Sequence, residues 1–327
     1  MSDIKVTLAL PPYPDDRWEL ARQMGVEYAH PHTAMGEAGL GSGDVRVDHV
    51  PRDYDELLRL INAFENVGLE VPVVGPAGTI SDTTRLGRDG RDEDIAAFCE
   101  HLKHVGAVGV PVVTYSWMTR FWWMRTGERV PLRGNSLSTE YNHEQSERGP
   151  KEPIDASEED LWDNLAYFLE RVVPVAEDAG VKLALHPDDP PLSPVRGVPR
   201  IITSPNAYDR VLELQPSEAN GISFCVGNFV AMETDVPAMV RHFDDRIHYA
   251  HFRDVEGDPE SFVEVWHDEG PTDMRAVLAA FKDIDFDGPM RPDHVPTMQG
   301  ETNERPGYEM KGRIFAVGYM RGLLESL

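Results

Sequence analysis

Short apolar runs alternate with longer amphipathic stretches along almost the whole chain. Eight of these runs are four to eight residues long and are bounded by polar or turn residues, a pattern typical of buried strands. They cover residues 5–10, 26–30, 70–74, 110–116, 181–186, 221–226, 247–252 and 289–292.

The stretches between these runs carry apolar residues every three or four positions, which indicates amphipathic helices. Several of them end at glycine, a favoured residue at helix C-termini. Ser204, Thr234 and Thr272 stand at or near helix starts, where a hydroxyl can accept from free backbone N–H groups. The predicted helices cover residues 21–25, 53–68, 92–106, 158–180, 204–214, 236–243, 272–284 and 307–327.

Alternating strands and helices predict parallel βα units, and eight strands are the number that closes a barrel. We therefore expect an α/β fold, a (β/α)8 TIM barrel that forms a single domain over residues 1–327. A doubly wound open sheet shares the alternation, but it usually has a glycine-rich loop after its first strand, where this chain has LPPYPDD. Residues 119–155 and 188–200 break the rhythm after strands, so we expect loop insertions at the C-terminal face, the first of them over 119–155.

Composition excludes several classes of protein. No run of about 18 apolar residues is present to span a bilayer, and the start MSDIKVTLALPPYPDD does not resemble a secretory signal, so we expect a cytoplasmic protein. The two cysteines, Cys99 and Cys225, give no sign of a disulfide framework.

The net charge of −26 is extreme, and lysine occurs at six positions while arginine supplies the other basic residues. Nucleic acids and membranes are therefore poor partners. An acidic surface with little lysine suggests adaptation to high salt, because counterions screen the self-repulsion. An unusually acidic protein from an ordinary environment remains the alternative.

Four consecutive predicted strands each end in a residue able to bind a metal, in the motifs LALHPDD, ISFCVGNF, YAHFRDV and MRPDHV. In a barrel the C-terminal ends of different strands converge, so His186, Cys225, His251 and Asp293 could meet in space. Two imidazoles, a thiolate and a carboxylate would suit a divalent transition metal. Taken singly, each residue also fits a structural role, such as a buried strand residue or a helix cap.

Other histidines are weaker candidates. His248 would point away from His251 by strand alternation, so we expect a structural role for it. We assign no role to His30, His32, His242 and His267.

The segment LWDNLAYFLERVVPVAEDAGVKLALHPDDPP, followed in order by GISFCVGNF, HYAHFRDV and MRPDH, resembles the mannonate dehydratase family. The resemblance extends upstream through EVPVVG and VVTYSWMTRFWWMRT and downstream to GYEMKGR, from about residue 68 to the C-terminus. The N-terminal third departs from the family pattern, with LALPPYPDDRW and YAHPHTAM where members carry an arginine- and tryptophan-bearing strand and a His-Ile-Pro-like segment. Because these segments would contact substrate, the resemblance specifies the reaction better than the exact aldonate.

The resemblance implies a xylose-isomerase-like barrel with Mn(II) or Fe(II) at the four positions singled out above. It implies a small-molecule sugar-acid substrate, D-mannonate, which loses water to give 2-keto-3-deoxy-D-gluconate. His294 matches the family's proton-transfer residue, with Tyr308 and Arg291 as candidates for acid work and carboxylate binding. The alternative for His294 is a hydrogen bond that only orients Asp293. We also expect a homo-oligomer.

Several nearby residues keep two interpretations. Asp188 and Asp189 could orient His186 or bind substrate hydroxyls, but a Pro-Asp-Asp-Pro turn also uses aspartate locally. The cluster Trp117, Trp122 and Trp123 could wall a sugar pocket or pack a loop.

Two other functions fit the same fold. A metal-dependent sugar isomerase or epimerase would also stabilise an enediolate, but such sites are typically rich in carboxylates, and Cys225 weighs against it. A sugar-acid-binding protein without catalysis is the second, and the presence of all four donor residues plus His294 weighs against it.

The charge predicts that stability depends on salt. Because the negative charges repel one another unless they are screened over the Debye length of about 10 Å in ~0.1 M salt, molar KCl should raise the melting temperature. Thermal melts in dilute buffer and in molar KCl test this, and an unchanged midpoint would contradict it.

Overall fold

Eight parallel strands form one sheet in the order β2-β1-β12-β9-β8-β7-β4-β3. The computed structural model describes residues 4–32, 52–75 and 80–327. The strands are β1 Lys5–Leu10, β2 Tyr28–Pro31, β3 Val73–Val74, β4 Val112–Ser116, β7 Lys182–His186, β8 Asn220–Cys225, β9 Ile247–Phe252 and β12 Pro289–Pro292. The sheet closes where the Ala29 N–H donates to the Glu70 carbonyl over 2.7 Å, just before β3. All eight predicted strands are present, and the predicted barrel is confirmed.

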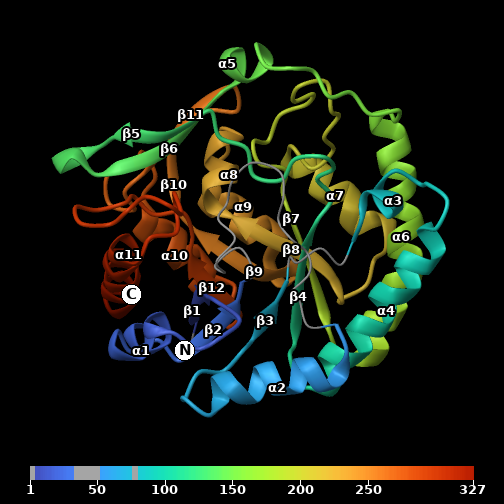
Figure 1. Ribbon diagram of the computed structural model, residues 1–327, viewed down its shortest axis with the longest axis horizontal. Coiled ribbons are helices and arrows are strands. Elements are labelled where there is room, and N and C mark those ends of the chain that lie inside the picture. Colours follow the sequence, from blue (N-terminus) through green and yellow to red (C-terminus); the bar gives the residue numbers. More distant parts are fainter. Residues whose placement is uncertain (1–3, 33–51, 76–79) are drawn as a thin grey trace.

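Helices surround the barrel, with α2, α4 and α6 along one side and α1, α10 and α11 along another (Figure 1). Their bounds are α1 Asp16–Gln23, α2 Tyr54–Glu65, α3 Asp82–Arg85, α4 Arg91–Ala107, α5 His143–Glu147, α6 Glu158–Ala179, α7 Pro205–Leu214, α8 Val226–Ala231, α9 Val236–Phe243, α10 Met274–Asp283 and α11 Met310–Glu325. Short 3-10 helices cover Arg133–Asn135 and Asp244–Arg246. Among the described residues, none of these helices has the length and apolar character needed to cross a membrane.

Local sequence explains where the helices begin and end. Helix α6 begins after Ser157, which forms a capping box with Asp160, and ends at Gly180, whose positive φ of 68° glycine adopts without strain. Ser204 caps α7 as predicted. Helices α9 and α10 are capped instead by aspartates, one residue after the predicted Thr234 and Thr272.

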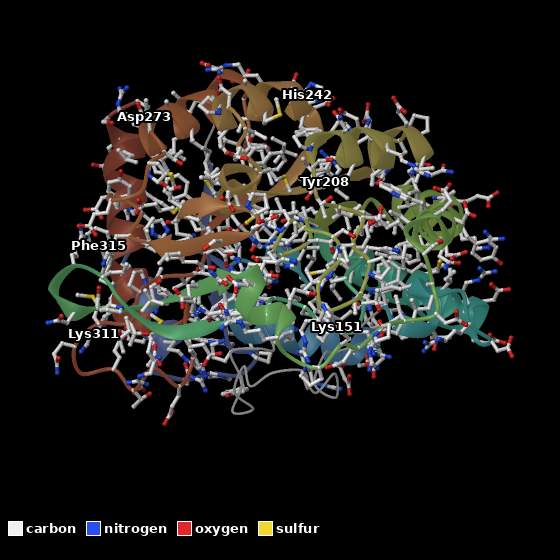
Figure 2. All side chains as sticks on the ribbon, turned by 90° about the horizontal axis from the view of Figure 1, so that it is seen from above. Lys151, Tyr208, His242, Asp273, Lys311 and Phe315 are labelled. Atoms are coloured by element: carbon white, nitrogen blue, oxygen red, sulfur yellow. The ribbon has the colours of Figure 1, made fainter. Side chains whose placement is uncertain are left out.

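Strand alternation divides the buried residues into two groups. The main core lies between sheet and helices and includes Leu183, Phe224 and Phe252. A smaller cluster of Val73, Val112, Ala184 and Tyr249 fills the barrel interior. Figure 2 shows Tyr208 among the packed side chains, whereas His242, Asp273 and Lys311 lie at the rim of the molecule.

A second, antiparallel sheet, which we call the accessory sheet, was not predicted. Its order is β10-β11-β6-β5, with bounds β5 Gly127–Pro131, β6 Leu137–Asn142, β10 Asp254–Asp258 and β11 Ser261–Val265. The segment 119–155, predicted as an insertion, contains β5, β6 and α5. Because the two hairpins leave the barrel after β4 and β9, the accessory sheet lies at the C-terminal end of the barrel strands (Figure 1).

Four buried charged side chains join the accessory sheet to the barrel, and we call them the ion-pair network. Arg125 precedes β5, Glu264 belongs to β11, Asp189 follows β7 and Arg253 follows β9. Arg125 Nη1 lies 2.6 Å from Asp189 Oδ1, and Arg125 Nε donates to Glu264 Oε1 over 3.0 Å. Arg253 Nη2 donates to Asp189 Oδ2 over 2.8 Å. Two cations and two anions therefore share one buried site.

Removing one cation from this network should destabilise the protein. Arg125→Met would leave Asp189 and Glu264 buried with one guanidinium between them, so we expect a loss of about 3–5 kcal/mol in the free energy of unfolding. Arg241→Met is the control, because Arg241 pairs with Asp283 on the surface at 2.8 Å and such pairs contribute at most about 1 kcal/mol. Urea denaturation measures both variants, and equal losses would contradict a special role for Arg125.

Candidate active site

The predicted metal donors lie at the C-terminal ends of four neighbouring barrel strands. His186 ends β7, Cys225 ends β8, His251 is the penultimate residue of β9, and Asp293 follows β12. Strand register pairs Cys225 with His251 and Arg291 with His251, which places these ends at one level. Strand alternation turns His186, Cys225 and His251 inward, on the same side as Ala184 and Tyr249.

The donor atoms of these residues meet. One atom each from His186, Cys225 and His251 lies within 4.8 Å of the other two. His186 Nε2 is 3.1 Å from His251 Nδ1, and Asp293 Oδ2 is 3.5 Å from the same nitrogen. The structure thus brings together all four residues singled out from the sequence.

The protonation states of the two histidines suit metal binding. His186 Nδ1 lies 2.8 Å from the Pro187 carbonyl, which can only accept, so Nδ1 carries the proton and Nε2 presents a lone pair toward His251. Burial lowers the pKa of His186 to about 4. Burial, with Arg291 nearby, also holds the pKa of His251 well below its usual value. Both rings are therefore neutral imidazoles near pH 7, the form that ligates metals.

The two acidic donors differ. Burial opposes ionisation of Asp293, but Arg291, at 2.8 Å, and neighbouring positive groups outweigh it, so the pKa of Asp293 lies well below its usual value. Burial raises the pKa of Cys225 to about 12, so its thiol would release a proton when a cation binds. A buried set of two imidazoles, a thiol and a carboxylate fits a divalent transition metal.

A second cluster surrounds His294, immediately after Asp293. His294 Nδ1 is 2.8 Å from Glu264 Oε1, and His294 Nε2 is 3.1 Å from the Tyr308 hydroxyl and 3.7 Å from Asp293 Oδ2. Burial raises the pKa of Tyr308 above its usual value, so the phenol stays protonated near neutral pH. Arg291 pairs with Asp293 and His294 contacts Tyr308, so His294, Tyr308 and Arg291 lie beside the predicted metal donors.

The three tryptophans, which could wall a pocket or pack a loop, differ in their surroundings. Trp117 is buried, donates to the Leu161 carbonyl over 3.2 Å and packs on Phe168, so it belongs to the core. The Arg85 guanidinium lies over the Trp122 ring at 5.6 Å. The Trp123 ring centroid lies 4.8 Å from that of His294, so Trp123 borders the site.

The two aspartates after β7 make different contacts. Asp188 Oδ2 accepts from the backbone N–H groups of Ile201 and Ile202 at 3.0 and 2.7 Å, which ties the start of the proline-dense segment 188–200 to the backbone just beyond its end. Asp189 instead belongs to the ion-pair network. Contacts that close the 188–200 segment thus account for Asp188, and a contact with the accessory sheet accounts for Asp189.

Three of the other histidines named above, His248, His267 and His242, have structural partners. His248 Nδ1 donates to the Leu183 carbonyl over 2.7 Å, and His267 Nε2 donates to the Phe252 carbonyl over 2.8 Å. His242 pairs with Asp209 on the surface. His30 contacts the Tyr249 hydroxyl at 2.9 Å inside the barrel. The His32 ring centroid is 5.8 Å from that of Tyr308.

Sequence reasoning missed Glu264, which contacts His294, and the two arginines that pair with it, Arg125 and Arg253. Arg253 could have been found, because it lies two residues after His251 and so faces the same way. Glu264 lies in the alternating run SFVEV after the turn residues GDP, a hairpin signal. No sequence pattern marked Arg125 as a site residue. Of the divergent segment YAHPHTAM, residues 33–35 lie outside the described part of the chain.

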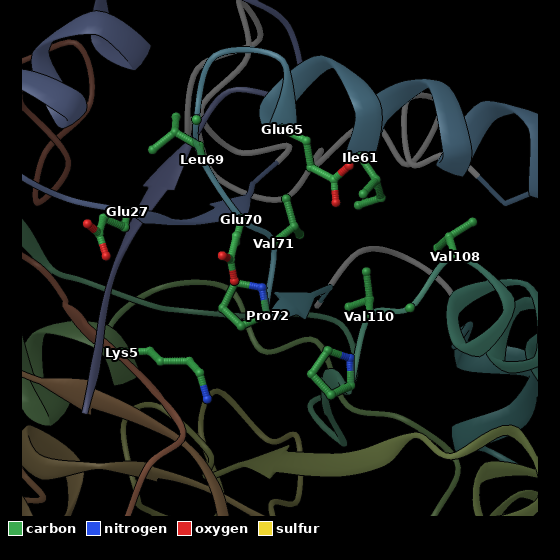
Figure 3. Close-up of a pocket in the computed structure, with 13 residues that line it drawn as sticks. Lys5, Glu27, Ile61, Glu65, Leu69, Glu70, Val71, Pro72, Val108 and Val110 are labelled. Carbon is green, nitrogen blue, oxygen red and sulfur yellow. The ribbon is translucent and has the colours of Figure 1, made fainter. Parts of the chain in front are cut away.

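A cavity of about 750 Å³ lies at the opposite end of the barrel (Figure 3). Lys5, Glu27, Glu70 and Pro111 line it, and each stands at or before the start of a strand. Because barrel chemistry is carried by the C-terminal strand ends, this cavity is separate from the site around His251 and His294.

Comparisons with known proteins identify the family. The model of the family described as D-mannonate dehydratase (UxuA) matches residues 43–156 and 152–327. Mannonate dehydratase 2 of Halalkalibacterium halodurans is 36% identical over 303 residues, covering 84% of this chain and 87% of that protein. Mannonate dehydratase of Thermotoga maritima is 36% identical over 312 residues, covering 84% and 86%.

Solved structures give the same result. The crystal structure of mannonate dehydratase from Streptococcus suis serotype 2 matches with a TM-score of 0.86 and 31% identity, over 99% of this chain and 95% of that one. D-psicose 3-epimerase of Clostridium cellulolyticum H10 matches over 98% of this chain and 99% of that one, with a TM-score of 0.61 and 13% identity, and shares the fold alone. The family match and the relatives' identity over most of the chain show that this protein belongs to the D-mannonate dehydratase family, whose members are hydro-lyases.

Proposed function

We propose that this chain removes water from D-mannonate to give 2-keto-3-deoxy-D-gluconate, with one divalent metal ion held by His186, Cys225, His251 and Asp293. One observation carries the proposal: His294 Nε2 lies 3.7 Å from Asp293 Oδ2, so an acid–base group adjoins the donor cluster. The names of the relatives supply the substrate.

The reaction has two parts. The C2–H bond next to the substrate carboxylate breaks and its proton goes to a base, while the C3 hydroxyl accepts a proton and leaves as water. The resulting enol then becomes the 2-keto group. When bound at the donor cluster, Mn(II) or Fe(II) would supply Lewis-acid stabilisation of the negative charge beside the substrate carboxylate.

The protein's own groups hold and move the protons. With Nδ1–H directed at Glu264, His294 offers Nε2 as the proton-accepting atom. Tyr308 keeps its hydroxyl proton and lies 3.1 Å from that nitrogen, so it can donate toward the departing hydroxyl. Arg291 adds a fixed positive charge suited to the substrate carboxylate.

Product analysis tests this function. Metal-loaded protein is incubated with D-mannonate and other aldonic acids, and 2-keto-3-deoxy acids are measured. Turnover of another aldonate alone would support the dehydration reaction but reject D-mannonate as the substrate. A stereoisomer of the substrate as product would favour an epimerase. Bound metal without turnover of any aldonate would favour a binding protein.

Replacing a donor should release the metal. We expect about one metal ion per chain, and His186→Ala or Cys225→Ser should lose most of it, because loss of one of four ligands weakens binding severely. Cys99→Ser and His242→Ala are matched controls on α4 and α9 and should retain it. Elemental analysis showing full occupancy in both donor variants would reject the assignment.

Adjacent residues separate metal binding from proton transfer. Asp293→Asn should lose metal and activity together. His294→Asn should keep the metal yet lose about 100-fold or more in kcat, the usual scale for a general acid or base. If His294→Asn releases metal, and activity returns when metal is added in excess, the residue only supports Asp293.

The native metal, the homo-oligomer, the cytoplasmic location and the adaptation to high salt remain predictions from sequence. Metal analysis of the isolated protein, light scattering and the salt-dependent melts described above address the metal, the assembly and the salt dependence.

A further inference from the structure

We propose that Glu264, carried by the accessory sheet, is a positioning residue for His294: its carboxylate fixes the ring so that Nε2 faces the metal donors and Tyr308. This inference rests on the proposed acid–base role of His294. It also gives the accessory sheet a part in catalysis.

The hydrogen bonds determine which ring nitrogen carries the proton. Glu264 Oε1 lies 2.8 Å from His294 Nδ1, and an ionised carboxylate can only accept. Nδ1 must therefore carry a hydrogen, and in the neutral ring Nε2 is left with its lone pair. That lone pair points toward the Tyr308 hydroxyl, 3.1 Å away.

The ion-pair network keeps Glu264 in the accepting form. Arg125 donates to Glu264 Oε1, and Arg253 Nη1 lies 3.4 Å from the same oxygen. Two guanidinium groups beside one buried carboxylate favour its charged state. Glu264 is only 2% exposed, so solvent does little to screen these contacts.

The accessory sheet fixes where this carboxylate lies. Glu264 pairs with Val255 across the β10–β11 hairpin, and its carbonyl accepts from Ser138 Oγ over 2.7 Å. Trp123, from the segment before β5, packs on the His294 ring. Backbone pairing and ring packing thus hold both partners of the hydrogen bond.

A second metal site is the competing interpretation of the cluster formed by Asp189, Glu264 and His294. One donor atom each from Asp189, Glu264 and His294 lies within 4.8 Å of the others. However, the guanidinium groups of Arg125 and Arg253 contact both carboxylates. They already supply the positive charge that a cation would bring, and they would repel one.

The test is a double-mutant cycle on kcat. Glu264→Gln keeps the size of the side chain but removes its charge and can donate to Nδ1. With His294 present, we expect kcat to fall about 10-fold or more, with KM for D-mannonate and metal content unchanged. In the His294→Asn background the same change should cost less than about 2-fold, because its effect acts through His294.

Asp254→Asn is the matched control, because Asp254 is a buried carboxylate of the same sheet whose partner is Thr272. This variant should change kcat by less than about 2-fold relative to the unmodified protein, as expected for a side chain that is energetically independent of His294. Glu264→Asp, which retains the charge, should recover part of the lost activity. An equal loss from Glu264→Gln in both His294 backgrounds, or no loss at all, would overturn the proposal.

A readout independent of activity is the tautomer of His294. In 15N-histidine-labelled protein loaded with diamagnetic Zn(II), we expect His294 to be protonated at Nδ1, and Glu264→Gln should shift the tautomer. The His294→Asn spectrum assigns the signal, and an unchanged tautomer would overturn the proposal. If instead His294→Asn retains full turnover, the proposed acid–base role fails, whatever the spectra give.

Discussion

Burying two arginines and two carboxylates in one place is the constraint on which the site depends. A buried charge without a partner is costly, so Arg125, Arg253, Asp189 and Glu264 must keep their contacts with one another. These residues come from four separate segments: the loop before β5, the end of β9, the loop after β7, and β11. Their mutual contacts fix how the accessory sheet lies against the barrel. Because Glu264 also contacts His294, the same contacts fix the ring beside Asp293.

Strand geometry supplies the other half of the arrangement. Parallel register places Cys225 level with His251, and His251 level with Arg291, so donor and cationic side chains meet without any long loop. Alternation sends His251 inward and His248 outward, where it donates to the Leu183 carbonyl. The proposed metal donors thus stand at the ends of barrel strands. The residues proposed for proton transfer come from the segment after β12, where Glu264 of the accessory sheet contacts His294.

Sequence periodicity predicted the barrel and the convergence of the four strand-end residues because both depend on local, repeated signals. A strand of period two and a helix of period 3.6 can be recognised within one segment, and strand ends converge in any barrel. Boundaries were less accurate: β3 covers Val73–Val74 where 70–74 was predicted, since Glu70 makes only an isolated bridge.

The accessory sheet could not be predicted in the same way. Its strand β5 reads GERVP and is largely exposed, so no apolar alternation marks it. Its pairing also joins segments more than 100 residues apart, as in Val263 with Glu140. The contact between Glu264 and His294 therefore depends on pairings that no single segment encodes, although the hairpin β10–β11 carries a turn signal of its own.

The choice of arginine in the ion-pair network changes how the composition should be interpreted. Arg125 contacts both Asp189 and Glu264, and Arg253 contacts these two and Asp293. A planar guanidinium with several N–H donors can serve two carboxylates at once, whereas a lysine offers one nitrogen at the end of a flexible chain. Burial thus selects arginine here regardless of salt. Part of the bias against lysine therefore comes from the site. The net charge of −26 reflects an excess of acidic residues, and the exposed ones are those that bear on adaptation to high salt.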